Sequence, residues 1–198
     1  MKYLSPDEVR RLKESGYDPV LLEASADTQR WEVANSLREK IESAFAGVTL
    51  GDGIGLMEGR GLDDYEQADV LARLHAQDER TDWRKFTSED LLSYQSSISF
   101  TDAEGMRFHL PAWMLGELRD DGIVGLIWSL CRIAPHNEHQ FSLLSPEQRF
   151  VVRDFLEFMR EDPEYEHERS EIEAAIEHIW SQVPPDQTQG EQDAPRNR

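Results

Sequence analysis

The predicted fold class depends on residues 97–110, which read Ser97-Ile98-Ser99-Phe100-Thr101, then Asp102-Ala103-Glu104-Gly105, then Met106-Arg107-Phe108-His109-Leu110. Apolar and polar residues alternate in 97–101 and again in 106–110, and a period of two is typical of half-buried strands. The four residues between the two runs favour a tight turn. The segment therefore predicts an antiparallel β-hairpin.

Helical patterns dominate on both sides of this hairpin. Ser5-Pro6-Asp7-Glu8 and Ser145-Pro146-Glu147-Gln148 each begin with a serine N-cap followed by proline, and the Glu or Gln three residues after the serine completes a capping box. Residues 6–15 are thus predicted to form one helix. Residues 62–76 and 87–94 are predicted to form others, and a further helix is predicted to begin at Pro111.

Two predicted helices have long apolar faces that we assign to the core. The first is capped by Asp27, and its apolar residues repeat every four positions; the second follows Ser145. Residues 123–133 are apolar enough for a buried strand or a buried helix, and the balance favours a helix. The apolar faces consist of Val33, Leu37, Ile41 and Phe45 in the first helix, and Phe150, Val151, Phe155, Phe158 and Met159 in the second.

These elements together predict an α+β fold that is mostly helical, with a small antiparallel β-hairpin sheet packed against helices. A chain of 198 residues has the length of one ordinary domain. We expect residues 1–183 to form a single globular domain. Residues 184–198 are polar and proline-rich, so they are predicted to be a disordered tail.

Composition limits the classes of partner. Forty acidic residues against 21 basic ones give a formal charge of −19, which repels nucleic acids and anionic membranes and favours a basic protein partner. Cys131 is the only cysteine, so an internal disulfide is excluded and a reducing compartment is indicated. No apolar signal segment or membrane-length apolar run occurs, and these features together predict a cytoplasmic protein.

A glycine-rich segment is the first candidate site. Its five glycines, which lead into Leu62-Asp63-Asp64-Tyr65-Glu66, permit unusual backbone angles or close approach to a ligand or to another segment. Leu56 and Glu58 occupy positions where the dinucleotide fingerprint requires glycine, so nucleotide binding is disfavoured. Ligand binding and close packing both remain open for this predicted binding loop, Gly51, Gly53, Gly55, Gly59 and Gly61.

Acidic residues near this segment are candidate ligands for a divalent cation, Mg²⁺ or Ca²⁺: Asp63 and Asp64 after the glycines, and Asp102 and Glu104 in the predicted turn. The alternative is that they only cap helices and turns. His109 is a candidate general base, which nearby carboxylates would orient. Its alternative is an ordinary solvated face of the predicted strand.

Four motifs carry a resemblance to a known family: Leu-Gly-Asp-Gly-Ile-Gly-Leu at 50–56, Gly-Leu-Asp-Asp-Tyr-Glu at 61–66, Asp-Glu-x-x-Asp-Trp at 78–83 and Phe-Thr-Asp-Ala-Glu-Gly-Met-Arg-Phe-His-Leu-Pro-Ala at 100–112. With them the chain resembles a family of uncharacterised bacterial proteins, a domain of unknown function. The resemblance implies a bacterial cytosolic protein. The family has no assigned activity, so it implies no functional residue.

Two functions from different classes fit these observations. The leading hypothesis is an acidic cytosolic bacterial module that binds a basic protein partner, of the immunity or regulatory type. The alternative is a divalent-metal-dependent enzyme whose pocket is formed by the Gly51–Glu66 loop and the Asp102–His109 hairpin. The sequence leaves the oligomeric state open.

Overall fold

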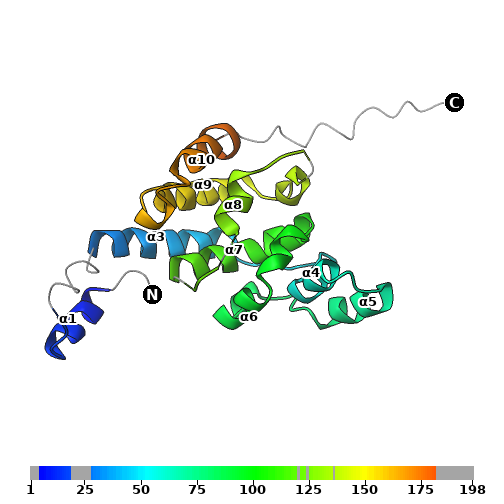
Figure 1. Cartoon of the computed structure of the whole chain (residues 1–198), viewed down its shortest axis with the longest axis horizontal. Helices are drawn as coiled ribbons and strands as arrows, with labels where there is room; N and C mark the ends of the chain where they lie inside the picture. Colours follow the sequence, from blue (N-terminus) through cyan, green and yellow to red (C-terminus); the bar gives the residue numbers. More distant parts are fainter. Residues whose placement is uncertain (1–4, 19–27, 120, 124, 136, 182–198) are drawn as a thin grey trace.

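The computed structural model describes residues 5–18, 28–119, 121–123, 125–135 and 137–181 (Figure 1). Helices and turns make up these residues, and no strand occurs among them. The α-helices are α1 (Pro6–Glu14), α3 (Thr28–Ala44), α4 (Leu56–Asp63), α5 (Ala68–Gln77), α6 (Ser88–Ser93), α7 (Ala103–Arg119), α8 (Leu126–Cys131), α9 (Pro146–Arg160) and α10 (Arg169–Ala175). Short 3₁₀ turns are η1 (Trp83–Lys85), η2 (Gln95–Ser99), η3 (Glu138–Phe141) and η4 (Pro163–Tyr165), and η5 (Ile176–Trp180) is a π-helical turn.

The predicted β-hairpin is wrong, and with it the α+β fold class. The first predicted strand lies mostly in η2, and the second lies in α7. Asp102, expected in a turn, caps α7 instead: its Oδ1 accepts a hydrogen bond from the Gly105 backbone N–H at 2.8 Å, and its carbonyl accepts from the Met106 N–H. An aspartate in this position starts a helix as effectively as it starts a turn.

The alternation of apolar and polar residues in 106–110 predicted a strand incorrectly because α7 is buried on nearly all sides. It packs against α3, α6, η1 and η3, and consecutive residues from Phe108 to Gly116 are buried. A helix surrounded in this way has no polar face, so its pattern lacks the helical period. Pro111 therefore lies inside α7 rather than at a helix start.

α3 and α9 lie side by side and run antiparallel (Figure 1). Near one end Arg30 Nη2 donates to the Phe158 carbonyl, and near the other Gln148 Nε2 donates to the Ala44 carbonyl. α3 also contacts α7, and α10 covers part of α9. Two buried tryptophans join distant segments, since the Trp83 indole N–H donates to the Phe45 carbonyl and the Trp180 indole N–H to the Leu130 carbonyl.

Several predicted helices are confirmed. Capping boxes open α1, α6 and α9, and α8 confirms a helix within 123–133. The predicted helix over 62–76 is correct only from Ala68, where α5 begins. Tyr65 has a positive φ of 57° and divides the region into α4 and α5, because the Tyr65 and Glu66 N–H groups turn back to the carbonyls of Leu62 and Gly61.

Some predictions concern residues outside the described ranges. These are the Asp27 cap and the polar tail at 184–198. The single domain over 1–183 stays a prediction. Among the helices that the structure describes, none combines the length and the apolar character needed to cross a bilayer.

Candidate functional site

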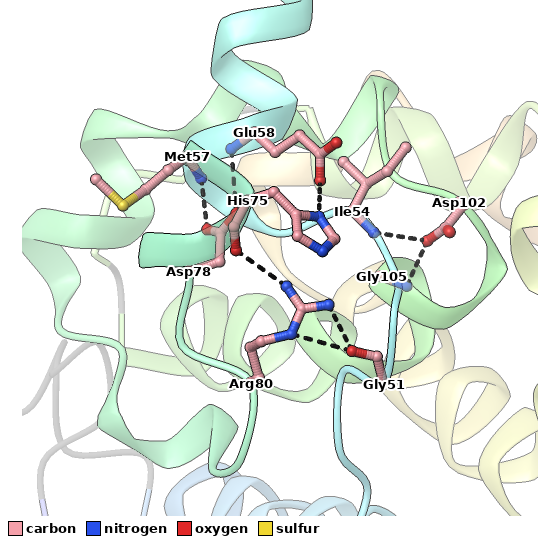
Figure 2. A network of polar contacts seen from close by, with 9 residues as sticks. All are labelled: Gly51, Ile54, Met57, Glu58, His75, Asp78, Arg80, Asp102 and Gly105. Carbon is pink, nitrogen blue, oxygen red and sulfur yellow. Dashed lines mark hydrogen bonds and ion pairs between the residues drawn. The ribbon is translucent and has the colours of Figure 1, made fainter. Parts of the chain in front are cut away.

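The glycine segment leads into α4, and its contacts require glycine. Gly55 is the N-cap of α4 and offers no side-chain acceptor. Asp78, which follows α5, replaces it: its two carboxylate oxygens accept from the Met57 N–H at 2.8 Å and from the Glu58 N–H at 3.2 Å (Figure 2). A Cβ on Gly55 would lie 2.0 Å from Asp78 Cγ. Glycine at the cap therefore makes room for a carboxylate from another element.

Arg80 ties the same region together. Its guanidinium donates to the Gly51 carbonyl and to the His75 carbonyl (Figure 2). Its own carbonyl accepts from the Leu50 N–H. Burial raises the pKa of Asp78, although the two backbone donors from α4 act in the opposite direction. The network fixes the end of α5 against the start of α4.

The structure places the glycine segment against the start of α7. Asp102 Oδ1 accepts from the Ile54 N–H at 3.1 Å as well as from Gly105 (Figure 2). A Cβ on Gly105 would lie 2.3 Å from the Ile54 carbonyl oxygen, and one on Gly53 would lie 2.6 Å from Glu104 Cβ. The two segments of the predicted pocket thus lie together, but backbone and side chains fill the space between Gly53, Ile54 and Gly105.

The remaining glycines of the predicted loop serve different contacts. Gly59 and Gly61 lie inside α4. Gly59 faces Ser97 of η2, and a Cβ on Gly61 would meet Leu71 and Leu74 of α5. Gly51 has a positive φ of 60° and is the acceptor for Arg80. Close packing accounts for Gly59 and Gly61, whereas the left-handed backbone conformation accounts for Gly51.

The four predicted metal ligands do not come together. Asp102 and Glu104 lie at the glycine segment, whereas Asp63 and Asp64 lie at the far end of α4, where Asp64 pairs with Arg60 at 2.8 Å. Within the described ranges, no group of three or more His, Cys, Asp and Glu side chains is placed to hold a metal ion. The divalent cation and the metal-dependent enzyme stay predictions without a ligand group to support them.

His109 lies inside α7, with no exposed surface. Its Nδ1 donates to the Gly105 carbonyl at 2.7 Å, and its ring lies among Phe86, Phe108 and Trp113 with centroid separations of 5.2, 5.0 and 5.5 Å. Burial lowers the pKa of His109 to about 4. A general base must reach its substrate, and this ring has no open side, so the catalytic role of His109 stays a prediction.

One polar pair was missed by sequence reasoning. His75 Nδ1 lies 2.7 Å from Glu58 Oε2 (Figure 2), and the His75 side chain is 35% exposed. The two residues are 17 positions apart in the sequence, so no short sequence window contains the pair. The break at Tyr65, which turns α5 back onto α4, produces this contact.

A groove with a volume of about 750 Å³ lies between α3 and α9. Val33, Ser36 and Lys40 of α3 face Asp154 and Phe158 of α9 in it. It continues past Ser36, Lys40 and Asp154 to Phe150 and Val151. We call this continuous surface the α3–α9 groove.

The α3–α9 groove has an exposed apolar side chain toward each end: Val33 is 48% exposed and Phe150 is 43% exposed. Sequence reasoning assigned both residues to core faces. A helix face has the same period whether a neighbour covers it or leaves it open. No signal in a single sequence separates these two cases.

The charged lining of this groove is mainly acidic. Its three basic residues each pair with a nearby carboxylate: Arg30 with Asp162 at 3.3 Å, Lys40 with Asp154 at 2.8 Å and Arg160 with Glu161 at 3.0 Å. Further acidic residues line its two sides, namely Glu32, Glu39, Glu147 and Glu157. Exposed glutamates are also present in α10 and in the turns that precede it.

Comparison with known proteins assigns the chain to a family but assigns no activity to it. A family model described as a family of unknown function (DUF6714) matches residues 33–183. The chain belongs to this family. The match confirms the resemblance to an uncharacterised domain, and the bacterial origin stays a prediction. Neither the curated proteins nor the solved structures gave a significant match.

The DUF6714 match covers both features described above. It begins at Val33 in α3 and includes all of α4, α5, α7 and α9. The capping network around Asp78 and most of the α3–α9 groove thus belong to the family domain. α1 and the first residues of α3 lie outside the matched range.

Proposed function

We propose that this DUF6714 protein is a protein-binding module, of the regulatory or immunity type, that docks a basic partner in the α3–α9 groove. The observation that carries the proposal is the exposed apolar lining at Val33 and Phe150 between acidic sides. Exposed apolar surface rimmed by polar residues is characteristic of interaction sites.

The charge distribution supports a basic partner. The nearby carboxylates already pair with Arg30, Lys40 and Arg160, so the groove adds little positive potential to a chain of charge −19. A positively charged protein would approach such a surface faster than a neutral one, and salt would screen that attraction. Binding should therefore weaken as ionic strength rises.

The test is affinity capture with the tagged full-length protein from a lysate of the cells that make it, at about 50 mM and about 300 mM NaCl. Wild type is compared with Phe150→Glu, which places a charge on the apolar end of the groove. Leu92→Glu is the matched control, because Leu92 is 41% exposed on α6 and does not line the groove.

We expect one basic protein that wild type and Leu92→Glu capture at low salt and that Phe150→Glu loses. Less of it should be retained at the higher salt. Capture of no partner would contradict the proposal, and so would a partner that binds Phe150→Glu as well as wild type.

A further inference from the structure

We infer that the segment of the partner that fills the α3–α9 groove is a basic amphipathic helix of about four turns. This inference rests on the proposed function and specifies the shape of the ligand. Two antiparallel helices packed side by side leave a furrow that accepts a third helix.

The length of the groove sets the length of the ligand. Its lining runs from Gln29 to Ser43 along α3 and from Glu147 to Glu161 along α9. Each range spans about 21 Å at the rise of an α-helix. A partner helix of about 14 residues matches that distance.

The apolar lining forms two positions rather than one continuous strip. Val33 and Phe158 lie in one part of the groove, and Phe150 and Val151 lie in the other. The ion pair between Lys40 and Asp154 lines both parts. The two parts lie about 12 Å apart along α9, the distance from Phe150 to Phe158. The partner helix therefore needs two apolar anchors seven or eight residues apart on one face, one against the exposed Val33 and one against the exposed Phe150.

The acidic sides determine the charge of the ligand. Glu32 and Glu157 border the part with Val33, and Glu39 and Glu147 border the part with Phe150. Lysine or arginine residues that flank the anchors would meet these carboxylates. A second copy of this chain fits less well, because it would bring another net charge of −19 against the same acidic surface.

The experiment uses two synthetic peptides of about 14 residues with the same composition of lysine, alanine and two leucines. In the first the leucines are about seven residues apart and share one face; in the second they are about nine residues apart and lie on opposite faces. Each fluorescently labelled peptide is titrated with the full-length protein, with Phe150→Glu and with Leu92→Glu.

We expect the first peptide to bind wild type and Leu92→Glu at least about tenfold more tightly than the second peptide does. Phe150→Glu should lower the affinity for the first peptide by about tenfold or more. Its effect on the affinity for the second peptide should be smaller. The attraction between lysines and the acidic protein is common to both peptides, so the difference between them reports the two anchors.

Equal affinity of the two peptides would overturn the inference, as would an absence of binding or an affinity that Phe150→Glu leaves unchanged. If the peptides fail in this way while lysate capture still yields a basic partner that depends on Phe150, the proposed function stands and only the helical ligand is wrong. If lysate capture yields no such partner, the proposed function fails whichever peptide binds.

Discussion

At the level of single residues, His109 shows how burial changes the role of a side chain. Its neighbours in sequence suggested a base held by acidic groups, but its position inside α7 surrounds the imidazole with aromatic rings. An imidazole in such surroundings is most stable in its neutral form. The sequence identifies a histidine that could take part in proton transfer. Whether that side chain is buried depends on packing between elements that are distant in the sequence.

This burial predicts a pH-dependent stability. The pKa of His109 is about 4 in the folded protein against 6.5 for an unperturbed imidazole, so between these values the unfolded chain binds a proton that the folded chain does not. The stability associated with the neutral ring is complete above about pH 6.5 and is lost as pH falls to about 4, by roughly 3 kcal/mol. Urea unfolding at a series of pH values measures this loss.

The control for that prediction is His109→Phe, which keeps an aromatic ring but removes the titrating group. As pH falls from about 6.5 to about 4, the unfolding free energy of wild type should decrease relative to that of the variant. Carboxylates titrate in both proteins and cancel in the comparison. A difference that stays constant over this range would show that His109 does not titrate as proposed.

At the level of elements, the sequence predicted the N-terminal ends of α1 and α9 correctly but did not predict that residues 103–119 form the helix α7. The capping boxes that open α1 and α9 involve residues three apart, so a short window contains the whole interaction. The environment of α7 comes from α3, α6, η1 and η3, which no short window contains. The same limit concealed the α3–α9 groove and the capping of α4 by Asp78.

The contact between Gly55 and Asp78 gives a prediction about how α4 and α5 are coupled. Gly55→Ser should destabilise the protein by roughly 2 kcal/mol, because its Cβ would lie 2.0 Å from Asp78 Cγ. Asp78→Ala should cost about 1–2 kcal/mol by removing the cap of α4. In the double variant the serine has room and caps the helix itself, so the combined loss should be smaller than the sum by about 1 kcal/mol or more.

Chemical denaturation of the four proteins in this cycle measures the coupling. Gly55→Ser combined with Asp63→Ala is the control, because Asp63 lies at the opposite end of α4 and its effect should add independently. If the losses of stability in Gly55→Ser and Asp78→Ala were additive in the double variant, the Asp78 carboxylate would not be acting as the cap that Gly55 lacks.

At the level of the whole molecule, the charge of −19 predicts opposite effects of salt on stability and on binding. Repulsion among acidic groups disfavours the compact state, so raising NaCl from about 10 mM to about 200 mM should raise the melting temperature. The same screening should weaken the binding of a basic ligand in the α3–α9 groove.

The double variant Glu173→Gln with Glu177→Gln is an internal control for this prediction. Both side chains are exposed near the end of the α10–η5 segment, where negative charge is unfavourable. This double variant should be more stable than wild type at low salt by up to about 1 kcal/mol and equal to it at high salt. Thermal unfolding and peptide titration in the same buffers measure both effects, and a melting temperature that falls as salt rises would show that ion pairs, rather than net repulsion, dominate the electrostatic energy.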